Sequence, residues 1–121
     1  MASVRILLAA AALMLAACGT MEGAAQTAQR AREHVVIQVS DDSVKTWNQA
    51  LNVASNLQKA YDGNVDVELV AFGNGIGMLQ MDSEVGNRIS EARRTGVKVI
   101  ACENTMRGHH LTKADMLADI A

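Results

Sequence analysis

Cys102 is the residue of this 121-residue chain best suited to covalent chemistry. It ends the apolar run 97–102, and backbone N–H groups exposed in a following loop or helix start would stabilise its thiolate and lower the thiol pKa. The thiolate is the nucleophilic form of cysteine. Free cysteines are also commonly buried as small hydrophobic residues, so a purely structural Cys102 is the alternative interpretation.

Two histidines, His109 and His110, follow Cys102 by seven and eight residues. Along a loop, one of them could act as the base or proton donor of the thiol, and His109 is the candidate. A solvated histidine pair is the simpler interpretation. A metal site made of these three residues lacks a fourth ligand at suitable spacing, so we predict no metal and no cofactor.

The glycine-rich segment 73–77 (Gly-Asn-Gly-Ile-Gly) precedes Met78. It is not a dinucleotide fingerprint, because its third glycine comes one position early. Its glycines could simply permit positive φ in a tight connection, or its amides could form an anion-binding nest that faces Cys102. The residues after Cys102 would shape the same pocket. The candidate binding residues are Asn74, Gly75, Gly77, Asn104 and Thr105.

Three short apolar runs bounded by polar residues predict the strands that would position these residues. The predicted strands are 34–40, 65–72 and 97–102. In the second, Val65 and Val67 alternate with Asp66 and Glu68, so we expect one side of this strand to be partly solvated.

The first strand is followed by a predicted helix that is capped by Ser43 or Asp42 and stops at 62–64. Trp47 and Leu51 recur on its inner face. Its amide-bearing flank consists of Asn48, Asn52 and Asn56. This flank belongs to a helix anchored on the core, or it makes a subunit contact.

Two further helices are predicted. Asp82 can cap one that carries Val85 and Ile89 on its inner face and closes at Gly96. The Thr-Lys-Ala-Asp run 112–115 has the form of a capping box that opens a last helix.

Alternating strands and helices predict an α/β domain with a mainly parallel sheet and flanking helices. In such sheets, ligands bind beyond the carboxyl ends of the strands. The segments expected to converge there are 40–43, 73–78 and 102–110.

The first 17 residues have the order of an export signal, with Arg5 before the apolar run 6–17. Twelve residues of helix cover about 18 Å, which is too short to cross a membrane. The sequence 15–18 (Leu-Ala-Ala-Cys) resembles the bacterial lipobox, which implies lipid attachment at Cys18. The alternatives are an ordinary secretory signal with an incidental cysteine and an uncleaved anchor.

These features divide the chain into a signal peptide (1–17), a lipidated cysteine with a flexible tether (18–33) and one α/β domain (34–121). A short amphipathic helix over 24–32 is the alternative for the tether. Gly19, in place of the aspartate that retains many lipoproteins at the inner membrane, implies a periplasm-facing outer-membrane location. With Cys18 lipidated, Cys102 is the only remaining thiol, and no intramolecular disulfide can form.

The composition of the chain indicates which kinds of partner molecule to expect. The net charge of −2 comes with no basic block, which excludes a nucleic-acid partner. A domain of this size buries about 60 to 65% of its unfolded surface, so oligomerisation is expected to contribute to its stability.

Five segments resemble the DsrE/DsrF-like proteins in order and spacing. They are 36–40 (Val-Ile-Gln-Val-Ser), 47–52 (Trp-Asn-Gln-Ala-Leu-Asn), 70–79 (Val-Ala-Phe-Gly-Asn-Gly-Ile-Gly-Met-Leu), 101–107 (Ala-Cys-Glu-Asn-Thr-Met-Arg) and 111–113 (Leu-Thr-Lys). The resemblance runs from about Val35 to Leu117. It implies a three-layer, flavodoxin-like or DsrE-type fold, assembly into homotrimers or homohexamers, and a cysteine that carries persulfide sulfur in the sulfur-relay members. By position, that cysteine is Cys102.

The chain departs from the family in two respects. The relay proteins are largely cytoplasmic, whereas this chain carries an export signal. Relatives continue past the position of Ala121 with a further strand, so we expect a truncated domain or a strand supplied by a partner.

Two functional hypotheses follow. In the first, Cys102 accepts sulfane sulfur as a persulfide, and the protein is a sulfur carrier or sulfurtransferase that exchanges sulfur with a donor or acceptor protein. In the second, the protein is a non-catalytic oligomeric binding module in which Cys102 is packed structurally. A metal-dependent enzyme ranks third.

Overall fold

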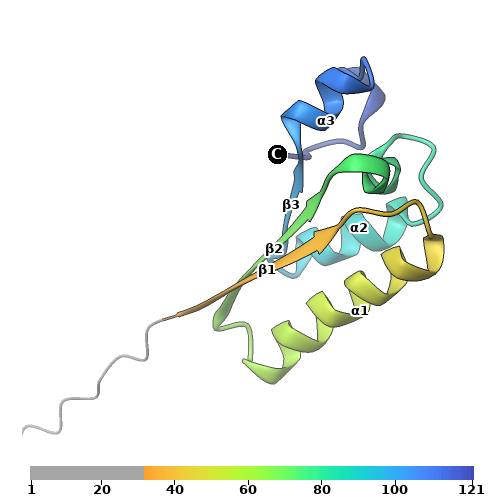
Figure 1. Cartoon of the computed structure of the whole chain (residues 1–121). Helices are drawn as coiled ribbons and strands as arrows, with labels where there is room; N and C mark the ends of the chain where they lie inside the picture. Colours follow the sequence, from red (N-terminus) through yellow and green to blue (C-terminus); the bar gives the residue numbers. More distant parts are fainter. Residues whose placement is uncertain (1–31) are drawn as a thin grey trace, which may run out of the picture. The chain divides into compact units, whose positions relative to one another are not determined.

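The computed structural model describes residues 32–121, which are coloured in Figure 1. The predicted signal peptide, Cys18 and nearly all of the tether lie outside the described residues. Within 32–121, no helix combines the length and the apolar character that crossing a membrane would require.

Three parallel strands form the sheet in the order β1-β2-β3. They are β1 (Glu33–Val39), β2 (Val65–Ala71) and β3 (Lys98–Ala101). Val39 pairs with Ala71, which pairs with Ala101, so the carboxyl ends of the strands share one edge of the sheet. The predicted α/β fold with a parallel sheet and flanking helices is confirmed.

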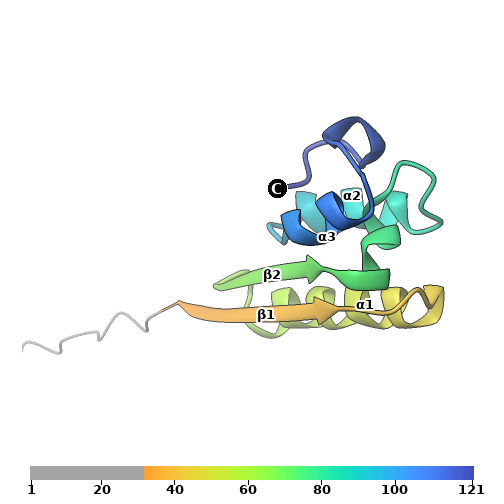
Figure 2. The ribbon, with the colours of Figure 1, turned by 45° about the horizontal axis from the view of Figure 1, so that its top comes forward.

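The two longest helices, α1 (Val44–Ala60) and α2 (Gly86–Arg94), lie on the same side of the sheet in Figures 1 and 2. Right-handed crossovers that step in one direction across a sheet place their helices on one face. Of the two predicted caps, Ser43 is the one that caps α1, and its side chain accepts the Thr46 N–H at 3.5 Å. The core lies between these helices and the inner face of the sheet. It includes Trp47, Leu51, Ala54, Val67, Leu69, Ile89 and Val99.

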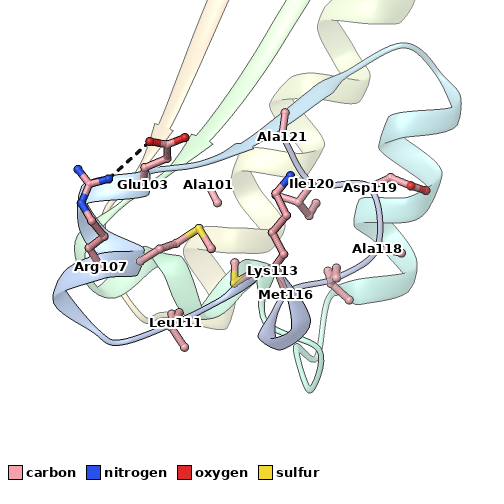
Figure 3. A pocket seen from close by; sticks show the side chains of 12 residues that line it. Ala101, Glu103, Arg107, Leu111, Lys113, Met116, Ala118, Asp119, Ile120 and Ala121 are labelled. Atoms are coloured by element: carbon pink, nitrogen blue, oxygen red, sulfur yellow. Dashed lines mark ion pairs between the residues drawn. The ribbon is translucent and has the colours of Figure 1, made fainter.

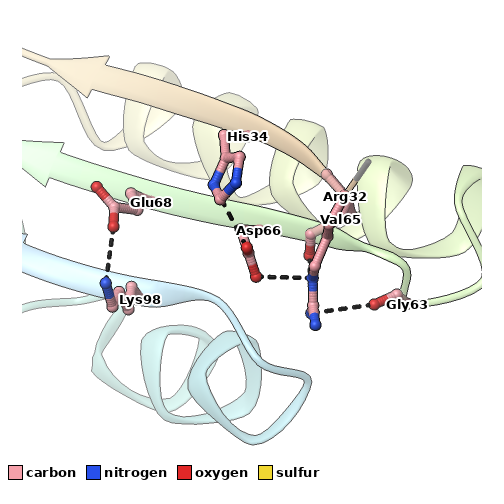
Figure 4. A network of polar contacts seen from close by, with 7 residues as sticks. All are labelled: Arg32, His34, Gly63, Val65, Asp66, Glu68 and Lys98. Carbon is pink, nitrogen blue, oxygen red and sulfur yellow. Dashed lines mark hydrogen bonds and ion pairs between the residues drawn. The ribbon is translucent and has the colours of Figure 1, made fainter. Parts of the chain in front are cut away.

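The outer face of the sheet carries side chains that are exposed or half-buried. Val36 is 57% exposed, and Asp66, Glu68 and Val70 of β2 are half-buried, which confirms the partly solvated side predicted for this strand. Figure 4 shows the ion pairs on this face. Asp66 contacts Arg32 at 2.8 Å and His34 at 3.3 Å, and Lys98 contacts Glu68 at 2.8 Å.

Several local predictions were wrong. The glycine-rich segment is not an open loop but a 3₁₀ helix, η1 (Gly73–Leu79). The helix predicted to start at Asp82 starts at Gly86, because Gln80 pairs with Met116 and holds this stretch in turns. The residues after Cys102 form a short helix, α3 (Glu103–Gly108).

The predicted capping box is present, but it opens only one 3₁₀ turn, η2 (Lys113–Asp115). Thr112 N–H donates to the Asp115 carboxylate at 2.7 Å. The chain then returns to the sheet, where the Ala121 N–H donates to Val99 O at 3.1 Å and Ala121 O accepts from the Ala101 N–H at 2.9 Å. This is the pattern of parallel pairing, so Ala121 lies beside β3.

Candidate functional site

The three segments predicted to converge meet at the carboxyl edge of the sheet. Phe72 N–H donates to Val39 O and Cys102 N–H donates to Ala71 O, both at 3.0 Å, so the strand ladder continues one residue beyond β2 and β3. Gly75 lies so close to the end of β1 that a Cβ there would be 2.3 Å from Val39 O. The sheet edge therefore brings Cys102 and the glycine-rich segment into one site.

Cys102 is half-buried and is the N-cap residue of α3. The pKa of its thiol is lowered, chiefly by the Thr105 hydroxyl, then by the N–H groups of Thr105 and Asn104 and the positive charge of Arg107. Partial desolvation opposes the shift and is outweighed. A larger fraction of this thiol is therefore ionised at neutral pH than in an ordinary cysteine.

Thr105 links Cys102 to the glycine-rich segment. Its Oγ1 accepts the Gly73 N–H at 3.0 Å. A hydroxyl has one hydrogen to donate, and because Oγ1 is already an acceptor for Gly73, that hydrogen can be directed at the sulfur.

The amides predicted to form a nest around Cys102 have other partners. Gly73 N–H is bound by Thr105, and Gly75 N–H donates to Phe72 O at 3.0 Å. Gly75 permits the close approach to Val39, and a Cβ on Gly77 would contact the Trp47 ring at 3.5 Å. Asn74 is exposed. The glycines of this segment therefore serve the tight connection, which is the first of the two interpretations offered by the sequence.

His109 and His110 lie at the far end of α3 from Cys102. His109 N–H donates to Thr105 O at 2.9 Å as the helix ends, and both histidines are exposed. His109 follows Cys102 by seven residues, which corresponds to about 10.5 Å along the helix axis. The predicted loop between them is a helix, and it keeps His109 out of reach of the thiol.

The amide flank of α1 makes a contact within the chain. Arg88 of α2 donates to the side-chain oxygens of Asn48 and, at 2.7 Å, Asn52. These two amides therefore help to hold α2 against α1. Asn56 is exposed.

A pocket of about 510 Å³ lies between α3 and the C-terminal segment (Figure 3). It is lined by Ala101, Glu103, Met106, Arg107, Leu111, Lys113, Met116, Leu117, Ala118, Asp119, Ile120 and Ala121. Cys102 is not part of this lining, although both of its neighbours are. No sequence pattern predicts this pocket, and its only local signal is the apolar residues that belong to none of the three strands or two main helices.

No group of three or more His, Cys, Asp or Glu side chains suited to a metal ion occurs among residues 32–121.

Solved structures that resemble this one include the following two. Protein MTH1491 from Methanobacterium thermoautotrophicum, described as a protein of unknown function, superposes with a TM-score of 0.69 at 28% sequence identity, over 73% of this chain and 78% of that chain. The ychN protein from E. coli superposes with a TM-score of 0.58 at 13% identity, over 74% and 80%. No protein-family model and no curated protein matches the sequence. Because both solved structures have the DsrE-like fold, this protein is an α/β protein of DsrE-like fold.

Proposed function

We propose that the protein handles sulfane sulfur or thiols through a persulfide on Cys102. The observation that carries this proposal is the position of Cys102, half-buried at the carboxyl edge of the sheet and at the N-cap of α3. There the Thr105 hydroxyl and the N–H groups of Thr105 and Asn104 lower the thiol pKa. The DsrE-like fold also supports the proposal. In the sequence resemblance to DsrE/DsrF-like proteins, the cysteine that carries sulfur in the relay members corresponds to Cys102.

The proposed reaction is a sulfur exchange. The Cys102 thiolate attacks the outer sulfur of a donor persulfide, R–S–SH, and forms a new S–S bond. The donor's own S–S bond breaks, its electron pair leaves with R–S⁻, and Cys102 becomes Cys102–S–SH. Attack by an acceptor thiolate on the outer sulfur reverses these steps. No external oxidant or reductant is consumed.

The groups around Cys102 can stabilise its thiolate both before it attacks the donor and after sulfur has passed to the acceptor. Thr105 and the Asn104 N–H stabilise the attacking thiolate, and the Arg107 guanidinium adds a positive charge nearby. The same donors can serve the thiolate that is regenerated when sulfur passes to the acceptor. His109 has no part in the proposed mechanism.

The test is sulfur loading of the full chain with glutathione persulfide, in a Cys18→Ser background that leaves Cys102 as the only thiol. Intact-mass analysis should show one added sulfur atom that dithiothreitol removes. The matched control is Cys18→Ser/Cys102→Ser. Loading that persists in this control would contradict the proposal.

We further propose that the protein is anchored by lipid on Cys18 and faces the periplasm from the outer membrane. The supporting features are Arg5, the apolar run 6–17 and the lipobox-like sequence 15–18. Metabolic labelling with a clickable palmitate analogue should mark the wild type and not Cys18→Ser. Label that remains on Cys18→Ser would contradict lipidation at this residue.

A non-catalytic binding module remains the second candidate function, and the outer face of the sheet favours it. Val36 exposes 57% of its surface there, and neither α1 nor α2 covers this face. Native-state alkylation separates the two candidates. Rapid labelling of Cys102 supports sulfur chemistry, whereas labelling only after denaturation supports the binding module.

A further inference from the structure

The pocket beside α3 has an aliphatic interior. Met106, Leu111, Met116, Leu117 and Ile120 contribute to its lining, and none of the lining residues is aromatic. A planar ring would find nothing to stack on, whereas flexible methionine and branched aliphatic side chains adapt to an alkyl chain. The volume of about 510 Å³ lies in the range of small-molecule sites.

Some charged side chains of the pocket lining have an ion-pair partner and one does not. Glu103 pairs with Arg107 at 3.5 Å, and Asp119 pairs with Arg93 at 3.6 Å. Lys113 also lines the pocket, and its ammonium makes no ion pair with any residue of 32–121. In Figure 3 the Lys113 side chain extends across the pocket towards Ile120. The two acidic side chains of the lining are therefore each paired with an arginine, and Lys113 is the lining cation without an ion pair among residues 32–121, beside the aliphatic side chains.

We propose that this pocket binds a small amphiphilic anion, an unbranched alkyl chain with a carboxylate head, such as a medium-chain fatty acid. The head group pairs with Lys113, and the alkyl chain lies on Met106, Met116 and Ile120. The site is separate from Cys102, whose side chain does not line it. The proposal therefore does not depend on persulfide chemistry.

This assignment predicts how affinity varies with ligand structure. Each additional buried methylene should strengthen binding by up to about fourfold until the pocket is full. The charge of the head group should matter as well, so decanoate should bind more tightly than the decyltrimethylammonium cation.

The test is NMR on the full chain labelled with ¹³C at the methionine methyl groups and titrated with decanoate below its micelle concentration. The Met106 and Met116 methyl signals should shift and saturate. The Met78 signal should stay in place, because this side chain is fully buried in the core and outside the pocket lining. Lys113→Gln should weaken binding by about fivefold, the effect of a partly screened ion pair.

Lys45→Gln is the matched control, because Lys45 is exposed on α1 and does not line the pocket. It should leave the affinity unchanged. The proposal is overturned if Met106 and Met116 do not shift, if Lys113→Gln and Lys45→Gln bind alike, or if the decyl cation binds wild type as well as decanoate does. The same titration in Cys102→Ser should match wild type, so failure here is distinguishable from failure of the sulfur-transfer proposal.

Discussion

Thr105 is the single side chain on which the ionisation of Cys102 depends most. Its hydroxyl is the largest cause of the lowered thiol pKa, and the same oxygen accepts the Gly73 N–H at 3.0 Å. A side chain of the same shape without a hydroxyl would remove the donor to sulfur and also leave the Gly73 amide without its acceptor.

We expect Thr105→Val to raise the pKa of Cys102 and Thr105→Ser to keep it close to wild type. A raised pKa means less thiolate at a given pH, so alkylation by iodoacetamide should slow at neutral pH and its midpoint should move to higher pH. The measurement is the pH profile of the native-state labelling rate in the Cys18→Ser background. Equal midpoints in Thr105→Val and wild type would exclude Thr105 from this role.

Gly75 has a packing role that its position in a glycine-rich motif does not reveal. Because an added Cβ would lie 2.3 Å from Val39 O, Gly75→Ala must push η1 away from the end of β1. We expect a loss of about 1 to 3 kcal/mol in the free energy of unfolding, measured in urea.

Gly108→Ala is the matched control for this prediction. A Cβ on Gly108 would meet no heavy atom within 4 Å, and the residue is helical, so this substitution should be neutral or stabilising by up to about 1 kcal/mol. Equal losses in the two variants would show that the Gly75 contact is not responsible.

At the level of helices and strands, sequence patterns failed to predict the short helices α3 and η2 correctly. α3 has six residues, none of them fully buried, so it leaves no helical periodicity to detect. Its start is nevertheless what places the Thr105 and Asn104 N–H groups near the sulfur. The capping box was predicted correctly because it is a local motif, yet only tertiary contacts decide that η2 ends after one turn.

The capping box also predicts a dependence of stability on pH. Hydrogen bonds from Thr112 lower the pKa of Asp115 below its ordinary value of 3.8, so the carboxylate is favoured in the folded state. Its contribution is present above about pH 4 and is lost as the pH falls through the lowered, folded-state pKa. Asp115→Asn should therefore reduce stability at pH 7, and this loss should shrink as the pH falls from 4 through the lowered pKa of Asp115, as measured by thermal unfolding.

The same comparison with Asp62→Asn provides a control, since the Asp62 side chain makes no hydrogen bond or ion pair with other residues of 32–121. If Asp115→Asn destabilised the protein equally at pH 3 and pH 7, the loss would have a cause other than the charge of the Asp115 carboxylate.

At the scale of the whole molecule, the sheet is covered by α1 and α2 on one face only (Figure 2). Homotrimers or homohexamers were expected from the family resemblance and stay a prediction. The outer face offers a surface for such a contact, because Val36, Val70 and Ile100 lie on it and the flanking charges are paired within the chain.

If this face is the subunit contact, Val36→Lys should lower the molar mass measured by light scattering, because a cation would then be buried without a partner. Val53→Lys is the matched control, since Val53 is 48% exposed on α1. Both variants should keep the fold, as neither side chain is in the core. An unchanged mass in Val36→Lys, or a reduced mass in Val53→Lys, would place the contact elsewhere.

The three strands, the first helix with a cap at Ser43 or Asp42, and a parallel sheet could all be predicted from the sequence, because alternation, helical spacing and caps are set by neighbouring residues. From the alternation of strands and helices, the carboxyl edge of the sheet and Cys102 could be identified as the place for chemistry.

The groups that lie near the sulfur depend on tertiary contacts. Thr105 reaches Cys102 because the chain turns into α3 there, and Gly73 bonds to Thr105 although 32 residues separate them. His109 is excluded for the same reason, and the pocket around Lys113 and Met106 exists only because the C-terminal segment folds back beside β3. Contacts between residues distant in sequence depend on how whole elements pack, and no local pattern records that packing.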